Sequence, residues 1–135
     1  MFSEFAHDHG QPTPWEYAIY GGGELVTGTL LKVNTDALNK GRLIKAVGPE
    51  MPDYIAMSSG TFVTGDQIAV IPVKAGKKYR TIATDVIATP HRGSMHQIHV
   101  DGIGITAEAE NGHVELVAWD GPSISAGDEV IVQFK

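Results

Sequence analysis

The chain has 135 residues, a formal net charge of -6 at pH 7 and no cysteine. Its length fits one domain with a sizeable core. The acidic balance argues against nucleic-acid binding, which draws on clustered Lys and Arg, and the lack of cysteine excludes disulfides and thiolate metal sites. No apolar run reaches the roughly 20 residues of a membrane-spanning helix, and the first residues do not resemble a signal peptide. We therefore expect a soluble protein that binds neither nucleic acid nor membrane.

The first 23 residues differ from the rest of the chain. They show no hydrophobic period, and their two prolines disfavour regular structure. We predict an extended N-terminal arm over residues 1–23, ended by a glycine hinge, and a β domain over residues 24–135. The arm either folds back over its own body or lies on another subunit or partner, because its aromatic side chains need a surface to cover. These side chains are Phe2, Phe5, Trp15, Tyr17 and Tyr20.

The middle of the chain predicts short strands separated by turns. Alternating or apolar stretches with many Val, Ile and Thr favour strands, and we expect them over residues 24–33, 42–47, 53–57, 64–73 and 78–88. Two of these stretches look alike: residues 61–70 match residues 123–132 around a shared Gly-Asp turn. This likeness is either an internal duplication or a common way to begin a strand. The lysines and arginine between residues 74 and 80 are expected on a solvated turn and strand edge.

The last part of the chain, residues 93–135, predicts a β-meander. A two-residue Asp-Gly turn at 101–102 would place Val100 opposite Ile103 and Ile98 opposite Ile105. An Asn-Gly turn at 111–112 would place Ala109 opposite Val114 and Ala107 opposite Leu116, on the same face. In the closing strand, Val130, Val132 and Phe134 share one face. About nine strands and no convincing helix predict an all-β fold, a small β-barrel or sandwich with a C-terminal meander and an extended N-terminal arm.

The candidate chemical groups do not form a recognisable catalytic site. His7 and His9 share one side of an extended chain, but His96 and His99 are three residues apart on a strand and would point to opposite faces. We expect surface or subunit-contact histidines rather than a metal site. The glycines at 21–23 lack the Lys and Ser/Thr of a phosphate loop, and no serine stands in a nucleophile elbow. We predict no catalytic residue, no metal and no cofactor.

Two aspartates follow glycine in the look-alike turns. Asp66 and Asp128 could be considered a carboxylate pair for acid-base chemistry. Aspartate in this position, however, usually accepts a hydrogen bond from a nearby backbone N–H. We therefore expect both to cap their turns.

Two stretches of the chain resemble the head decoration, or cement, proteins of tailed bacteriophages. The first runs from Tyr54 through the Thr64-Gly65-Asp66 turn to Val70. The second is the meander from Gly102 to Phe134, with its Ala126-Gly127-Asp128 turn. The likeness covers roughly residues 24–135 and consists of short, turn-rich motifs.

The resemblance implies a non-enzymatic protein on the outer capsid surface of a virion assembled in the host cytoplasm. It implies binding to the major capsid protein, often as a homotrimer, with the arm clamping adjacent capsid subunits. The arm aromatics then become candidate capsid or subunit contacts. These are Phe2, Phe5, Trp15, Tyr17 and Tyr20.

Two other functions remain open. The chain could be another virion component, such as a tail or adhesin domain, that binds glycan through Trp119 or Trp15. It could also be a small β-barrel enzyme with a histidine-based metal site. Glycan binding without capsid affinity would favour the first, and a fully folded, metal-free sample would exclude the second.

Overall fold

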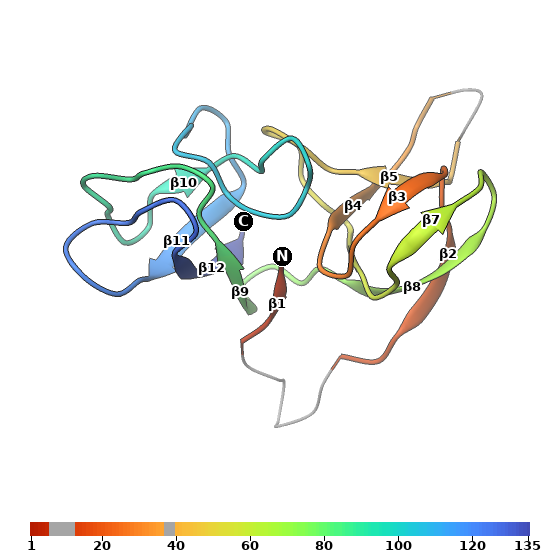
Figure 1. Ribbon diagram of the computed structural model, residues 1–135, viewed down its shortest axis with the longest axis horizontal. Helices are drawn as coiled ribbons and strands as arrows, with labels where there is room; N and C mark the ends of the chain where they lie inside the picture. The colour runs from red at the N-terminus through yellow and green to blue at the C-terminus, as the bar shows by residue number, and fades with distance from the viewer. Residues whose placement is uncertain (6–12, 37–39) are drawn as a thin grey trace.

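Strands build this protein, as the computed structural model in Figure 1 shows. It describes residues 1–5, 13–36 and 40–135. These residues form twelve strands and no helix, which confirms the all-β prediction. The three sheets are antiparallel and make a sandwich-like body, not a closed barrel. Two groups of strands lie side by side, and β1 (Ser3–Glu4) runs between them (Figure 1).

The first sheet contains the predicted C-terminal meander. Its strand order is β1–β9–β12–β11–β10. The bounds are Lys78–Ile82 for β9, Met95–His96 for β10, Val114–Ala118 for β11 and Glu129–Phe134 for β12. The last three strands follow one another in the chain and lie next to one another in the sheet. The predicted alternation of β12 is confirmed, because Val130, Val132 and Phe134 are all buried.

The second sheet has the strand order β2–β8–β6–β4–β5. The bounds are Glu16–Ile19 for β2, Leu30–Val33 for β4, Leu43–Lys45 for β5, Tyr54–Ala56 for β6 and Gln67–Pro72 for β8. A bridge between Tyr20 and Leu43 joins the ends of the two outer strands, so the sheet curls until its edges touch at one point. A separate pair of strands, β3 (Gly23–Leu25) and β7 (Gly60–Phe62), packs beside it.

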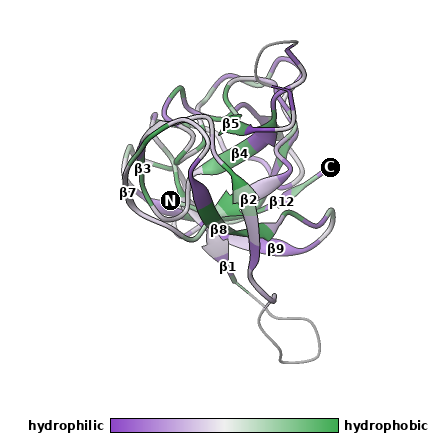
Figure 2. Cartoon of the chain, turned by 90° about the vertical axis from the view of Figure 1, so that its right-hand side faces the viewer, coloured by the Kyte–Doolittle hydropathy of each residue, from purple (hydrophilic) through white to green (hydrophobic). Residues whose placement is uncertain are grey.

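Two hydrophobic clusters hold these sheets together. The larger one takes side chains from both groups of strands, including Phe134 from the first sheet and Leu30 and Ile55 from the second. The smaller cluster belongs to the second sheet and contains Ile68. In Figure 2, β4 and β8 are coloured green over the apolar residues that contribute to these clusters. Because the larger cluster is shared, the two groups of strands form one body.

The first predicted hairpin turn is only partly confirmed. Ile98 and Ile105 pair as expected, and both are buried. Val100, however, is 78% exposed. The turn runs from His99 to Gly102, whose N–H donates to the His99 carbonyl over 2.8 Å. This longer turn takes Val100 out of the strand and away from the buried face.

The second predicted hairpin is wrong. Val114 and Leu116 lie in β11, which pairs with β10 and β12. Ala107 and Ala109, the expected partners, are exposed and belong to no strand. β11 therefore pairs with the strands that come before and after it in the chain, and not with residues 107–109.

The turn at residues 111–112 still forms, but it does not join two paired strands. Asn111 has a φ of 54°, and the Gly112 N–H donates to the Ala109 carbonyl over 3.1 Å. A Cβ atom at Gly112 would lie 2.3 Å from the carbonyl oxygen of His96. Glycine is required here because the turn presses the chain against the backbone of β10.

The strand expected over residues 24–33 is interrupted in its middle. The Thr29 N–H donates to the Val26 carbonyl over 3.1 Å, which closes a turn between β3 and β4. Gly28 adopts a φ of 94° in this turn, and its carbonyl accepts a hydrogen bond from the Phe2 N–H over 2.9 Å. The break in the strand is thus the place where the N-terminal residues dock.

Candidate functional site

The arm aromatics divide into buried and exposed residues. Phe2 and Tyr20 are only 1% and 3% exposed. Phe5, Trp15 and Tyr17 are 48%, 60% and 68% exposed. Three of the predicted contact residues are therefore available on the surface of this chain, whereas the other two belong to its own core.

Phe2 lies in the larger hydrophobic cluster. Its ring centroid is 5.8 Å from that of Phe134, which in turn lies 5.3 Å from Tyr79. β1 pairs with β9, with Ser3 opposite Arg80. The first residues are thus an edge strand of the first sheet and contribute to its core.

Tyr20 is buried at the other end of the arm. Its ring packs edge-on against Phe62, with centroids 6.2 Å apart. Burial raises the pKa of the Tyr20 phenol. Because Tyr20 also bridges to Leu43, it fixes the end of β2 to the curled second sheet.

A polar contact ties the two described parts of the arm together. The Lys77 Nζ donates to the Thr13 hydroxyl over 2.7 Å and lies 3.5 Å from Glu4 Oε2. The Thr13 N–H is 3.2 Å from Glu4 Oε1. We call Glu4, Thr13 and Lys77 the arm clasp. The Lys77 and Glu4 side chains are almost completely buried, so this lysine does not lie on the solvated turn that the sequence predicted.

The arm therefore packs on its own chain over residues 1–5 and 13–20, the first of the two alternatives. Residues 6–12, which include His7 and His9, lie outside the described residues. No signal in the sequence pointed to the arm clasp, because its three members are far apart in the chain and each belongs to a residue type that is usually exposed.

Exposed apolar side chains form a row along β2 and the residue before it. Trp15, which directly precedes β2, and Tyr17 and Ile19 within β2 are all large and exposed, Ile19 at 42%. The intervening Ala18 and Tyr20 point the other way and join the smaller cluster. We call Trp15, Tyr17 and Ile19 the β2 row. The alternation in the sequence predicted this shared side, although we did not include Ile19 among the contact residues.

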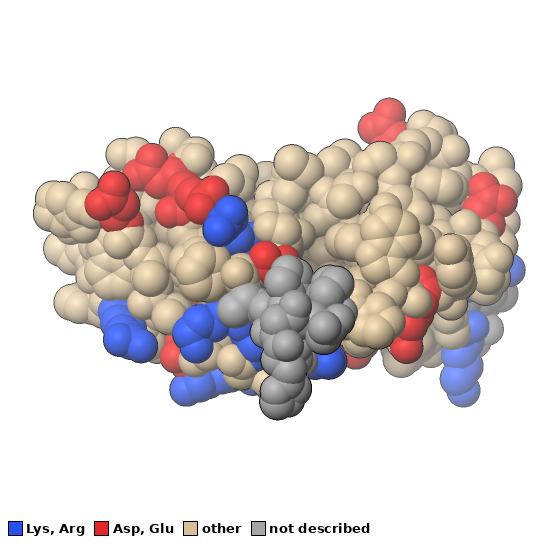
Figure 3. Space-filling view, turned by 90° about the horizontal axis from the view of Figure 1, so that it is seen from below, with Lys and Arg blue, Asp and Glu red and all other residues tan. Residues whose placement is uncertain are grey.

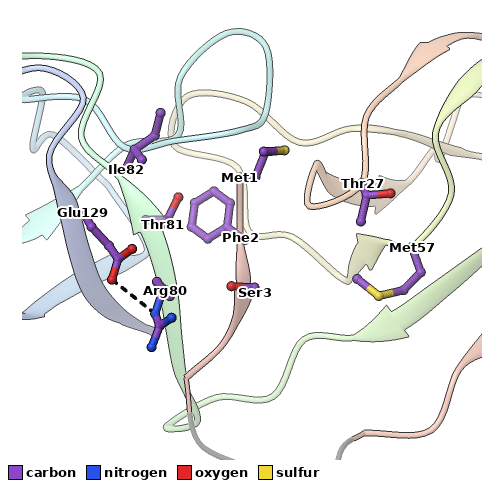
Figure 4. A pocket seen from close by; sticks show the side chains of 9 residues that line it. All are labelled: Met1, Phe2, Ser3, Thr27, Met57, Arg80, Thr81, Ile82 and Glu129. Atoms are coloured by element: carbon purple, nitrogen blue, oxygen red, sulfur yellow. Dashed lines mark ion pairs between the residues drawn. The ribbon is translucent and has the colours of Figure 1, made fainter.

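A second apolar feature lies near Phe5. A hollow of about 410 Å³ opens between β1 and β9 and the neighbouring loops of the second group (Figure 4). Phe2, Met57 and Ile82 help to line it, and an ion pair joins Arg80 to Glu129 over 3.2 Å at its edge. The Arg80 guanidinium lies 5.4 Å from the centre of the Phe5 ring. This hollow could accept an apolar side chain of a partner, and its lining could only be found from the tertiary structure.

Two shallow hollows meet at Trp119. Their volumes are about 280 and 250 Å³, and both contain Trp119, Asp120 and Glu129. The indole is partly buried against the larger cluster. An aromatic ring flanked by carboxylates suits a polar ligand with an apolar face.

The histidines do not gather into a metal site within the described residues, where no group of three His, Asp or Glu side chains is placed to hold an ion. His96 is buried. Its Nδ1 lies 2.9 Å from the Thr106 carbonyl oxygen and its Nε2 lies 2.9 Å from the Ser94 hydroxyl. His99 Nδ1 lies 2.7 Å from Asp101. Burial raises the pKa of Asp101, but hydrogen bonds from His99 and the Ile103 N–H outweigh it, and the net pKa is lowered.

His96 should make the stability of the protein depend on pH. Burial lowers the pKa of His96 below its ordinary value of 6.5, more than the Thr106 hydrogen bond raises it. The unfolded chain then binds a proton at a higher pH than the folded chain. We expect a stabilising contribution that is complete above about pH 6.5 and is lost as the pH falls toward the folded pKa, by at most about 1.4 kcal/mol per pH unit.

Urea unfolding at a series of pH values between neutral and mildly acidic would measure this dependence. The His96→Gln variant should show a flatter profile in that window, whereas His91→Gln, at an exposed histidine, should follow the parent. If His96→Gln and the parent lose stability in parallel, other groups cause the acid sensitivity.

The look-alike turns have the structural role that was predicted. Asp66 Oδ2 accepts the Val63 N–H over 2.9 Å, and Asp128 Oδ2 accepts the Ser125 N–H over 2.8 Å. Both carboxylates cap their turns, and the two lie at the starts of β8 and β12, in different sheets. The glycines at 21–23 connect β2 to β3, and the Gly21 N–H donates to the Leu43 carbonyl over 2.9 Å.

The charged side chains do not form one basic surface on the face in Figure 3, where Lys and Arg lie in separate groups with acidic side chains among them. The described ranges contain no helical segment with the length and apolar character of a membrane span. No model of a protein family matches this chain, and no curated protein matches it either.

Proposed function

We propose that this chain is a virion structural protein that binds the outer surface of a phage capsid and stabilises the head lattice by bridging major capsid protein subunits. The observation that supports this most is the β2 row, three large apolar side chains held on the surface of a well-packed body. Exposed apolar side chains that lie next to one another are typical of interaction surfaces. Trp and Tyr are also the residues that most often dominate binding energy at interfaces.

The arrangement of the row suits adhesion. β2 is already paired with β8, so a partner that covers it would not have to order a flexible segment, and binding would lose less conformational entropy. In this proposal no cofactor and no catalytic residue take part.

Several copies would strengthen such a contact. The proposal takes the homotrimer that the resemblance implies as its starting expectation, with binding sites that act together at high effective concentration. Exposed Phe5 and the neighbouring hollow would supply a second contact for the capsid. The solution mass of the purified protein, with and without empty heads, checks the number of copies.

Co-sedimentation with undecorated empty heads of a tailed phage that encodes this chain tests the proposal. The parent chain should bind, and a Trp15→Ser/Tyr17→Ser variant should bind at least about 30-fold more weakly, because truncating a central interface aromatic typically costs about 2 kcal/mol or more. Val100→Ser, which changes an exposed valine elsewhere, should bind like the parent. Deletion of residues 1–20 is not a suitable test, since it would remove Phe2 and Tyr20 from the core.

Failure of the parent to bind heads, or equal binding of the doubly substituted variant, would count against this function. In the second case the β2 row would not be the adhesive surface, and Phe5 would be the next residue to change.

A second candidate, a glycan-binding virion component, rests on Trp119 and its two flanking hollows. Sugar rings can stack an apolar face on an indole while their hydroxyls donate to carboxylates such as Asp120. A glycan array probed with the purified chain tests this: binding that is lost in Trp119→Ala and kept in Trp15→Ala would favour it over the capsid role.

A further inference from the structure

The hollow between the two groups of strands has the character of a ligand pocket. Its volume of about 410 Å³ lies in the range of small-molecule sites, which are mostly apolar with a few polar groups. Phe2, Met57 and Ile82 contribute to its apolar lining, and Arg80 lies at its edge. Figure 4 shows Arg80 on one side of the Phe2 ring and Met57 on the other. The hollow therefore has a charged end and an apolar end.

The apolar part of the hollow is recessed. Phe2 is 1% exposed, and Met57 is a partly buried side chain that packs against the larger cluster. A lipid bilayer contacts apolar side chains that protrude from a protein, so it would not reach this lining. A slender alkyl chain, in contrast, could lie along the Phe2 ring and the Met57 side chain. The shape of the hollow thus favours a single free molecule over a membrane surface.

The charges beside the hollow favour an anionic group. Arg80 and Lys78 lie two residues apart on the same face of β9, and Glu129 adds one acidic side chain to the lining. The ion pair with Glu129 is formed by Arg80 Nε. A guanidinium has further N–H donors on its two terminal nitrogens. These donors suit a carboxylate, which can accept two parallel hydrogen bonds from one guanidinium.

The Phe5 ring strengthens the charged end. It lies with its centre 5.4 Å from Arg80 Cζ, so it shields part of the guanidinium from water. A less hydrated cation forms stronger hydrogen bonds, because the local dielectric constant is lower. A partly desolvated positive charge at the end of an apolar hollow matches a molecule with a negative head and an apolar tail.

We infer that this hollow binds a single-chain alkyl carboxylate, with the carboxylate on the Arg80 guanidinium and the alkyl chain along Phe2 toward Met57. The ligand goes beyond the proposed function and does not depend on it, because the purified chain alone would bind it. Failure of the chain to bind heads would therefore leave this inference standing. An occupied hollow would not be available to a side chain of the capsid.

Isothermal titration calorimetry with hexanoate, octanoate and decanoate, each below its micelle-forming concentration, tests the apolar end. Each added methylene should tighten binding about fourfold, the effect of burying one CH₂ group, until the chain is longer than the hollow. Octanol and octyltrimethylammonium have tails of similar length and should bind more weakly than octanoate. Equal affinities for the three carboxylates, or a preference for the ammonium compound, would overturn the inference.

Three variants test the charged end. Arg80→Met keeps an apolar side chain but loses the guanidinium, so it should weaken octanoate binding at least about tenfold and leave octanol binding nearly unchanged. Arg92→Met changes an exposed arginine outside the lining and should bind like the parent. Glu129→Gln should bind octanoate more tightly, since it removes the carboxylate that competes for Arg80. Equal binding by Arg80→Met and the parent would contradict the assigned head-group contact.

The four methionines of the chain locate the ligand. Met1 and Met57 line the hollow, whereas Met51 and Met95 lie outside its lining. In nuclear magnetic resonance spectra of protein with isotope-labelled methionine methyl groups, octanoate should shift the signals of Met1 and Met57 and leave the other two in place. Shifts of all four signals, or unchanged signals at millimolar octanoate, would overturn the inference. Co-sedimentation with anionic lipid vesicles without binding of free octanoate would overturn it in favour of a membrane contact.

Discussion

Replacing Phe2 by alanine should lower the free energy of unfolding by about 3–5 kcal/mol, the usual cost of removing a fully buried phenylalanine. The second residue of a chain is normally a neutral place for substitution. Here the ring is 1% exposed and contacts Phe134 in the larger cluster. Chemical denaturation followed by fluorescence and circular dichroism would measure the change. A loss of this size is a large share of the stability of a domain, which is typically about 5–15 kcal/mol.

Phe5→Ala is the matched control for this change. Phe5 is the same residue type in the same segment, but it is 48% exposed and its described contact is with the Arg80 guanidinium. Its loss should cost no more than about 1 kcal/mol. Equal effects of the two substitutions would show that the first residues are not part of the core in solution.

Replacing Lys77 by methionine should cost about 3–5 kcal/mol, because it removes the ammonium group that lies beside the buried Glu4 carboxylate. Glu4 would keep the hydrogen bond from the Thr13 N–H but lose the nearby ammonium group. The arm clasp would then no longer connect the two parts of the arm. Denaturation of the Lys77→Met variant, compared with the parent at the same pH, measures this cost.

Two further variants separate the charge effect from simple loss of a side chain. Lys40→Met changes an exposed lysine elsewhere in the chain and should alter stability by no more than about 0.5 kcal/mol. Glu4→Gln combined with Lys77→Met removes both charges and should recover part of the lost stability. If the double variant is as unstable as the sum of the single ones, Glu4 and Lys77 do not interact.

The turn residues show where the local sequence was sufficient to predict the structure and where it was not. The Gly-Asp turns at 65–66 and 127–128 form as expected, because the aspartate bonds to a backbone N–H only three residues earlier. The Asn-Gly turn at 111–112 also forms, but the hairpin predicted from it does not. A turn type decides the local direction of the chain, whereas strand pairing depends on which segments bury their side chains against each other. For β11 these segments are β10 and β12, the strands before and after it in the chain.

The candidate site shows the same difference between what local sequence predicts and what distant contacts decide. Alternation at 15, 17 and 19 was enough to place three side chains on one side of an extended chain, because side-chain direction in a strand has a period of two. The same alternation could not tell that Phe2 and Tyr20 are core residues while Trp15 and Tyr17 are exposed. All four are aromatic, and their burial depends on contacts with Phe134, Phe62 and Leu43, which lie far away in the chain.

The sequence by itself determined the all-β class, the positions of most turns, the alternating buried face of β12 and the shared side of the β2 row. These properties arise from interactions within a few residues, so they can be followed along the chain. Only the tertiary structure decided the partners of each strand, the docking of the first residues and the burial of Lys77. Each of these depends on which distant segments meet, and that choice is made by the packing of the whole core.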